Sequence, residues 1–158
     1  MADGRIPQIE AMYCTHAPAL LEYLQRNFGS CASAEDLLQE TFLRWLRRSD
    51  AENSAVSPRA FLFGIARHVG LTALRRAKKT RTVPIDEVAA TQGADSAADL
   101  ERMRIAMAEL PEQIRETLEL RLRDELSYEE IAAVLEIPVG TVRSRLHTAL
   151  RLLREAMI

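Results

Sequence analysis

Apolar residues recur at intervals of three and four along most of the chain, which places them on one face of an α-helix. Neither an alternating run typical of a strand nor a hairpin signal accompanies them. We therefore expect an all-α fold. The predicted helices cover residues 7–28, 33–48, 58–79, 99–109, 111–123, 127–135 and a last stretch from 138 or 139 onward.

Serine and proline residues mark where several of these helices begin. The segments "SAED" from Ser33 and "SYEE" from Ser127 are capping-box patterns, and Ser57-Pro58 places a proline in a first turn. Pro18 falls inside the first predicted helix. That helix therefore either begins near Pro18 or is broken there.

The stretch "TRTVPIDEVAATQGADSAA", residues 80–98, is small and polar and has no apolar period, which is typical of a flexible linker. It divides the chain into two small helical domains. We expect these domains to cover residues 7–80 and 99–158, joined by a linker over residues 81–98.

The composition argues against several classes of protein. No run of about 18 apolar residues and no basic-then-apolar leader is present, so we expect a soluble cytoplasmic protein. Cys14 and Cys31 match no metal spacing and favour buried or free thiols over a disulfide. The sequence also lacks a phosphate-binding loop and a Ser/His/Asp set, which predicts a protein without catalytic residues, metal, cofactor or small-molecule substrate.

Charge is unevenly distributed, although the formal net charge is only −2. Residues 59–85 carry seven basic residues and no acid, whereas residues 86–130 carry five basic and thirteen acidic residues. Residues 131–158 return to four basic and two acidic residues. Two positive blocks separated by an acidic one would suit a protein that binds a polyanion at two sites. Solvated helix faces would give the same pattern, so charge alone leaves both interpretations open.

The segment "LSYEEIAAVLEIPVGTVRSRL" has the pattern of a helix-turn-helix. In its second helix the predicted buried stripe consists of Val142, Leu146, Ala149 and Leu153. The opposite face carries Ser144, His147, Thr148 and Arg151, with Arg143 beside them. Such a face suits the DNA major groove, and the capped helix and tight turn favour DNA binding over a plain amphipathic helix pair.

Two helices of the N-terminal half carry candidate binding faces. In "AEDLLQETFLRWL" and the arginine that follows it, one face is shared by Asp36, Glu40, Leu43 and Arg47, with Gln39 alongside. That face suits a basic helical protein surface, but Asp36 as a cap and Glu40–Arg44 as an ordinary ion pair would explain it equally well.

The helix "FLFGIARHVGLTALRRAKK" combines aromatic and basic residues. It ends in Arg75, Arg76, Lys78 and Lys79, with Arg67 and His68 two turns earlier and Phe61 and Phe63 near its start. Cations beside aromatic rings suit single-stranded nucleic acid. The alternative is that both phenylalanine residues belong to the core, and for each one considered separately the core interpretation is favoured.

These motifs, in this order, resemble a bacterial sigma factor of the extracytoplasmic-function group. "SAEDLLQETFLRWL" is similar to region 2.2, "PRAFLFGIARHVGLTALRR" to regions 2.3 to 2.4, and "LPEQIRETLELRLRDELSYEEIAAVLEIPVGTVRSRLHTALRLLR" to region 4. The "PRAFLF" segment, with which this helix starts, resembles the corresponding segment in the iron-starvation branch of these factors.

The resemblance implies three sets of contacts. The clamp helices of the polymerase β′ subunit would bind Asp36, Gln39, Glu40 and Leu43. The −10 element would be opened and held by Asn53, Phe61, Arg67, His68, Arg75, Arg76, Lys78 and Lys79. The −35 element would be read as duplex by Thr141, Arg143, Ser144, Arg145, His147, Thr148 and Arg151.

The same resemblance implies further partners. The polymerase β flap would be a second contact of the core enzyme, and the linker would thread toward the active-site and RNA-exit channel. An anti-sigma factor, free or held in a membrane, would be the regulator.

The chain departs from the family pattern in ways that bear on structure. Glu125 and Glu136 stand where glycine is usual, so these turns either avoid positive φ or are strained. Phe61 stands in place of a common tryptophan, and Thr148 occupies a place that is often arginine.

Two other functions remain as alternatives. A sigma-like decoy would bind an anti-sigma factor without starting transcription, but it has no need of the basic tracts. An ordinary helix-turn-helix regulator would leave the Asp36/Gln39/Glu40 face unexplained.

Overall fold

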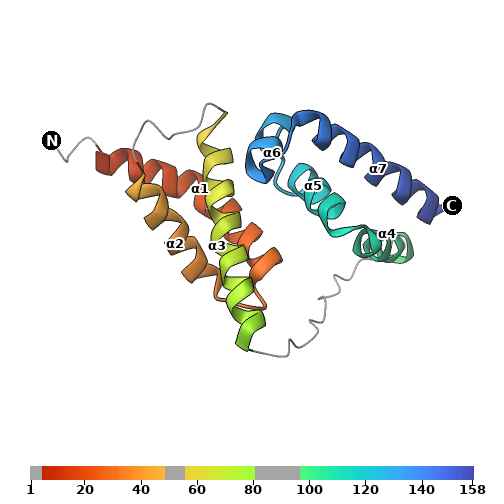
Figure 1. Ribbon diagram of the computed structural model, residues 1–158, viewed down its shortest axis with the longest axis horizontal. Helices are drawn as coiled ribbons and strands as arrows, with labels where there is room; N and C mark the ends of the chain where they lie inside the picture. Colours follow the sequence, from red (N-terminus) through yellow and green to blue (C-terminus); the bar gives the residue numbers. More distant parts are fainter. Residues whose placement is uncertain (1–4, 49–55, 81–96) are drawn as a thin grey trace. The chain divides into compact units, whose positions relative to one another are not determined.

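The computed structural model describes residues 5–48, 56–80 and 97–158, and within these ranges all regular secondary structure is helical (Figure 1). The helices are α1 (Arg5–Phe28), α2 (Ala34–Arg47), α3 (Pro58–Thr80), α4 (Ala97–Glu109), α5 (Glu112–Leu122), α6 (Tyr128–Leu135) and α7 (Val139–Met157). The chain divides into two compact units, Met1–Ile85 and Asp86–Ile158. The expected all-α fold with two helical domains is confirmed. The predicted linker lies almost entirely outside the described residues.

Helices α1, α2 and α3 form the first unit around an apolar core. Tyr23 and Phe63 lie at its centre with their ring centroids 5.3 Å apart in an edge-to-face arrangement. Helices α1 and α3 approach closely at Gly70, where a Cβ atom would stand 2.2 Å from the ring of Phe28. Any larger residue at position 70 would therefore require the Phe28 ring or the helices themselves to shift.

The prediction for Pro18 in the first helix is wrong. Neither expected outcome for Pro18 occurs, because α1 runs through it from Arg5 to Phe28. An interior proline removes one backbone hydrogen bond and crowds the preceding turn. Packing on both sides offsets this cost: Tyr13 lies with its ring centroid 4.8 Å from that of Phe42 of α2, and Leu20 is fully buried.

The serine residues begin their helices as predicted. Ser57 Oγ accepts a hydrogen bond of 3.0 Å from the Ala60 amide at the start of α3. At α6 the capping box is complete, because Ser127 Oγ accepts from the Glu130 amide and Glu130 Oε1 accepts from the Ser127 amide, both at 3.1 Å. At α2 the structure has the serine half of the box, with Ser33 Oγ accepting from the Asp36 amide at 3.4 Å.

Helices α4 to α7 form the second unit, and α6 and α7 make the helix-turn-helix. The predicted stripe of α7 is buried, and it consists of Val142, Leu146, Ala149 and Leu153. It packs with the α6 face that carries Ile131 and Val134. The prediction of the buried stripe is therefore confirmed.

Two turns of the second unit adopt positive φ at glutamate residues, and their backbone is therefore strained. Glu125 has φ 55° and Glu136 has φ 57°, both in the left-handed region that favours glycine. Glu136 is the residue that ends α6, and the next amide, that of Ile137, donates to the Ala132 carbonyl at 3.1 Å. The backbone path from α6 into α7 requires this conformation, whatever the side chain.

We predict that Glu136→Gly stabilises the second unit by about 0.5–1 kcal/mol, because glycine removes the left-handed penalty of about 1–2 kcal/mol and adds some chain entropy in the unfolded state. Urea unfolding followed by far-UV circular dichroism measures the change. Fluorescence of the single tryptophan, Trp45, reports the first unit and should keep its midpoint.

The control is Ala133→Gly, at an exposed position inside α6. It should destabilise the second unit by about 1 kcal/mol, since the helix interior disfavours glycine. If Glu136→Gly lowers the unfolding midpoint as Ala133→Gly does, then the positive φ at position 136 does not reduce the stability of the second unit.

Candidate nucleic-acid and protein interfaces

The outward face of α2 gathers the four residues predicted to meet the polymerase. Asp36, Gln39 and Leu43 are exposed and Glu40 is half-buried. The opposite face is buried in the first unit, and it carries Leu37, Leu38, Thr41 and Phe42. Burial of that apolar side therefore holds the acidic side outward.

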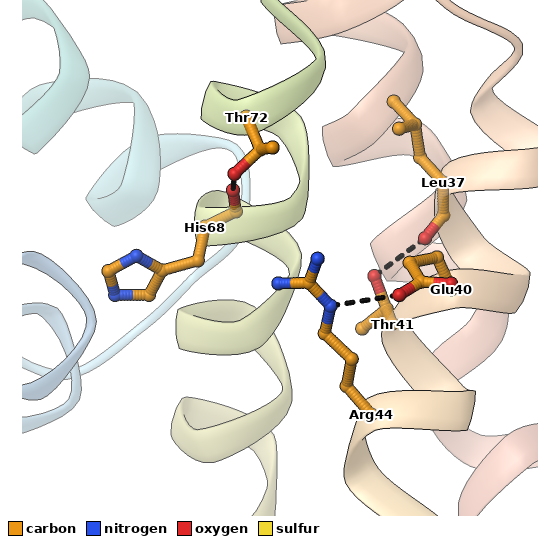
Figure 2. Close-up of polar contacts among 6 residues, drawn as sticks. All are labelled: Leu37, Glu40, Thr41, Arg44, His68 and Thr72. Carbon is orange, nitrogen blue, oxygen red and sulfur yellow. Dashed lines mark hydrogen bonds and ion pairs between the residues drawn. The ribbon is translucent and has the colours of Figure 1, made fainter.

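Glu40 forms the predicted ion pair. Arg44 Nε donates to Glu40 Oε1 at 2.9 Å, and the two side chains are 38% and 40% exposed (Figure 2). Figure 2 also shows the hydroxyl of Thr41 donating to the Leu37 carbonyl at 2.7 Å, which satisfies the one polar side chain on the buried side of this turn. An exposed pair of this kind contributes about 0.3–0.5 kcal/mol, so Glu40 can exchange Arg44 for another cation at little cost.

The acidic face continues into an apolar patch that sequence reasoning missed. Leu43 and Leu46 are 46% and 47% exposed and stand one turn apart on α2. Trp45 between them is half-buried. The signal was the helical spacing, because residues three apart such as Leu43 and Leu46 lie about 60° from each other on the helix. Exposed leucines beside carboxylates give α2 both an apolar and an electrostatic means of binding a helix.

The two phenylalanine residues of α3 differ in how deeply they are buried. Phe63 is fully buried in the core, as the alternative interpretation had it, whereas Phe61 is half-buried. At about 100° per residue, Phe61, His68, Arg75 and Lys79 lie within about 40° of one another. Their stripe spans about 27 Å at 1.5 Å per residue.

The other predicted contacts of this helix lie beside that stripe. Arg76 is exposed on one side of it, while Lys78 is exposed and Arg67 half-buried on the other. Asn53 lies outside the described residues. The hydroxyl of Thr72 donates to the His68 carbonyl at 2.9 Å, and the His68 imidazole points away from α2 (Figure 2). The described −10 candidates therefore spread over about half of the circumference of α3, with the stripe at the centre.

Positive charge extends to the first turn of α3. Burial, and to a lesser degree the nearby guanidinium of Arg59, lowers the pKa of His16 on α1. His16 is therefore neutral at pH 7, and the charge at this end of the bundle comes from arginine.

Helix α7 presents most of its predicted contacts outward. Arg143, Ser144, His147 and Arg151 are exposed, and Thr141 and Thr148 are half-buried at the edges of the face. Arg151 lies 3.3 Å from Glu155, one turn further along the helix. An exposed pair of this kind is weak, so Arg151 is available to a phosphate.

Arg145 differs from the other predicted contacts. It is half-buried, and its guanidinium donates a long hydrogen bond of 3.4 Å to Gln113 Oε1 of α5. Arg145 therefore lies on the side of α7 that faces α5, off the outward face defined by Ser144 and Arg151.

Among the described residues, few other groups suggest a metal site, a membrane contact or a reactive side chain. In residues 5–48, 56–80 and 97–158, no group of three His, Cys, Asp or Glu side chains could hold a metal ion. No helix in these ranges is long and apolar enough to cross a membrane. Cys14 and Cys31 are free thiols, as predicted. Burial raises the pKa of Cys31, whose Sγ donates to the Phe28 carbonyl at 3.2 Å, so this thiol is held in its unreactive form.

Comparison with known proteins places both units in one family. Residues 12–80 match sigma-70 region 2, and residues 100–153 match sigma-70 region 4. The extracytoplasmic-function (ECF) RNA polymerase sigma factor SigL of Mycobacterium tuberculosis (strain H37Rv) is 35% identical over 153 residues, covering 92% of this chain and 86% of the relative. The ECF sigma factor SigW of Bacillus subtilis is 30% identical over 149 residues, covering 84% and 79%.

A solved structure agrees with this placement. The sigma factor RpoE of Bartonella quintana, in complex with the anti-sigma factor NepR, matches with a TM-score of 0.61 and 27% identity, covering 87% of this chain and 91% of that one. The similarity therefore extends over most of this chain and most of each of these proteins. The chain belongs to the extracytoplasmic-function group of the sigma-70 family, the factors with which bacterial RNA polymerase recognises promoters and starts transcription.

Proposed function

We propose that this sigma factor divides its contacts among three helix faces, of which α2 binds core RNA polymerase, α3 opens and holds the −10 element, and α7 reads the −35 element. The helices α2 and α3 belong to a region 2 domain over residues 7–80, and α7 belongs to a region 4 domain over residues 99–158. The observation that carries this proposal is that both sigma regions match and each predicted face points outward from its own unit.

The α2 face suits the clamp helices of the β′ subunit. The exposed carboxylate of Asp36 and the half-buried one of Glu40 would pair with basic residues, and Leu43 would bury apolar surface at the centre of the contact. We propose that the β flap of the polymerase binds the region 4 domain. The linker over residues 81–98 would thread through the RNA-exit channel between these contacts.

The α3 and α7 faces suit two states of the promoter. On α3, an aromatic ring followed by cations fits an unpaired strand, since bases stack on rings and phosphates pair with cations. On α7, short polar side chains flanked by arginines fit the major groove of a duplex. Arg145 would support α7 through Gln113 and reach DNA only from the edge of the face.

An anti-sigma factor is the expected regulator. RpoE of Bartonella quintana was solved bound to one, and its chain shares 27% identity with this protein. An anti-sigma factor, free or membrane-bound, would act by covering the outward faces of α2, α3 or α7. Membership of the iron-starvation branch is a finer hypothesis, and it rests on the "PRAFLF" start alone.

The test of the function is reconstituted transcription. The purified chain is mixed with bacterial core polymerase and genomic promoter fragments, and the 5′ ends of the transcripts are mapped. We expect initiation at a small set of promoters that core polymerase alone does not use. A chain that binds an anti-sigma factor but initiates nowhere would be a decoy, and one that binds duplex DNA without polymerase would be an ordinary regulator.

We predict that Glu40→Lys lowers affinity for core polymerase at least tenfold, because it puts a like charge against the basic clamp helices. Binding of the labelled chain to core polymerase, measured by fluorescence anisotropy, gives the change. Glu22→Lys, on an exposed position of α1, makes the same charge change away from the face and should bind as the wild type does. Equal affinity of Glu40→Lys and wild type, with the helix content intact, would contradict the assignment of α2.

We predict that Arg143→Ala lowers discrimination between the correct −35 sequence and a single-base variant by about 1–3 kcal/mol, because Arg143 is exposed and can make a bidentate base contact. Competition binding of holoenzyme to paired promoter fragments measures the difference. Arg102→Ala on α4 removes an exposed charge elsewhere in the same unit and should leave discrimination unchanged. An equal loss on every sequence would instead identify Arg143 as a phosphate contact.

A further inference from the structure

His147 lies on the outward face of α7 between two arginines. All three side chains are exposed, with Arg143 one turn before His147 and Arg151 one turn after it. Residues four apart on a helix are separated by about 6 Å along the axis and by about 40° around it. Arg143, His147 and Arg151 therefore form a row about 12 Å long on the face that we assign to the −35 element.

The imidazole of His147 has no partner within the part of the chain that the structure describes, where no hydrogen bond, ion pair or ring contact joins it to another residue. Helices α4, α5 and α6 pack against the buried side of α7. The hydrogen bond from α7 to α5 is made by Arg145, which lies about 160° around the helix from His147. Residues 143–151 contain no acid, and Glu155 is paired with Arg151. The charged groups nearest to His147 on its own face are therefore cations.

Protonation of a histidine in such a row depends on what stands opposite it. An imidazole changes its charge between pH 5 and 8, whereas a guanidinium stays protonated. In the free protein, two cations one turn away disfavour the protonated imidazole. A phosphate beside it would reverse this balance, because the phosphate attracts the cation and accepts a charge-assisted hydrogen bond from it. Binding of DNA to this face would then take up a proton.

We propose that His147 makes binding of the −35 element depend on pH, because it contacts a DNA phosphate as an imidazolium. Position 147 lies in the third turn of α7, about 12 Å beyond the first residue of the helix, and the base edges are read by the residues nearer that end. His147 is therefore suited to the phosphate backbone at the side of the groove. This inference rests on the proposed function of α7.

The direction of the pH dependence follows from linkage. DNA favours the protonated imidazole, so His147 holds its proton to a higher pH in the complex than in the free protein. The gain in affinity is complete below the pH at which free His147 titrates. It is lost as the pH rises through the value at which DNA-bound His147 titrates. Promoter affinity should therefore increase on mild acidification.

The test uses holoenzyme assembled from core polymerase and the full chain, on a duplex fragment of a promoter identified by transcript mapping. Affinity is measured by fluorescence anisotropy from about pH 6 to about pH 8, the range in which histidine titrates. Three chains are compared at each pH: wild type, His147→Gln, which is neutral throughout, and His147→Arg, which is charged throughout. Because position 147 is exposed, both substitutions leave the core of the second unit intact.

We expect wild type to behave as the arginine variant at low pH and as the glutamine variant at high pH. At about pH 6 it should bind about fivefold more tightly than His147→Gln, and at about pH 8 the two should bind equally. His147→Arg should exceed His147→Gln over the whole range. Comparing chains at the same pH removes any pH dependence of the polymerase and of His16, which all three share.

Two measurements locate the effect. At about pH 6, the slope of log affinity against log salt should be steeper for wild type than for His147→Gln by up to about 0.9, the value of one phosphate contact in duplex DNA. On a fragment that begins downstream of the −35 element, the two chains should bind equally at every pH. Far-UV circular dichroism at both ends of the pH range checks that the three chains keep the same helix content.

The outcomes distinguish this inference from the proposed function. If wild-type holoenzyme initiates nowhere, the proposed function fails. If wild type initiates and all three chains share one pH dependence, only the role of His147 is refuted. A difference between wild type and His147→Gln that persists without the −35 element would also overturn it. A pH effect that vanishes when one base pair of the −35 element is changed would identify a base contact and overturn the phosphate assignment.

Discussion

Burial of one apolar stripe on each long helix is the constraint on which the other features of the structure depend. In α7, Val142, Leu146 and Leu153 face inward, and burying each such side chain stabilises the fold by about 1.5–3 kcal/mol. Turning α7 to present a different face would expose all of them at once. The side chains that we propose contact DNA are thus set by buried residues, and the same holds for α2, where Leu38 and Phe42 keep the carboxylates outward.

Much of the fold could be predicted from the sequence because its signals are local. Helix periodicity and serine caps act within a few residues, so the helices and their starts were predicted closely. Pro18 was misjudged because packing against α2 overrides a local backbone preference. Periodicity could not decide between Phe61 and Phe63, since burial there depends on where α1 and α2 lie. The strain at Glu136 follows from the path into α7, and the assignment of each face to a partner stays a prediction.

The ion pairs of Glu40 and Arg151 are weak, and this suits faces that exchange partners. Glu40 pairs with Arg44 and Arg151 with Glu155, each within one turn of its own helix and each well exposed. Pairs of this kind contribute a few tenths of a kcal/mol. A clamp helix or a phosphate can therefore replace the internal partner without destabilising the fold. A buried pair would cost far more to open and would hold the faces closed.

The mildly acidic net charge fits a division of DNA recognition between two units. A single domain that bound promoters tightly would need many phosphate contacts and would also bind every other sequence tightly. Here the cations of α3 and α7 belong to separate compact units, and each set is small. Binding to one large polymerase through α2 would bring both sets to the same promoter, which raises the effective concentration of the second contact once the first has formed. Modest affinity at each face is then sufficient, and specificity comes from requiring both promoter elements at the right spacing.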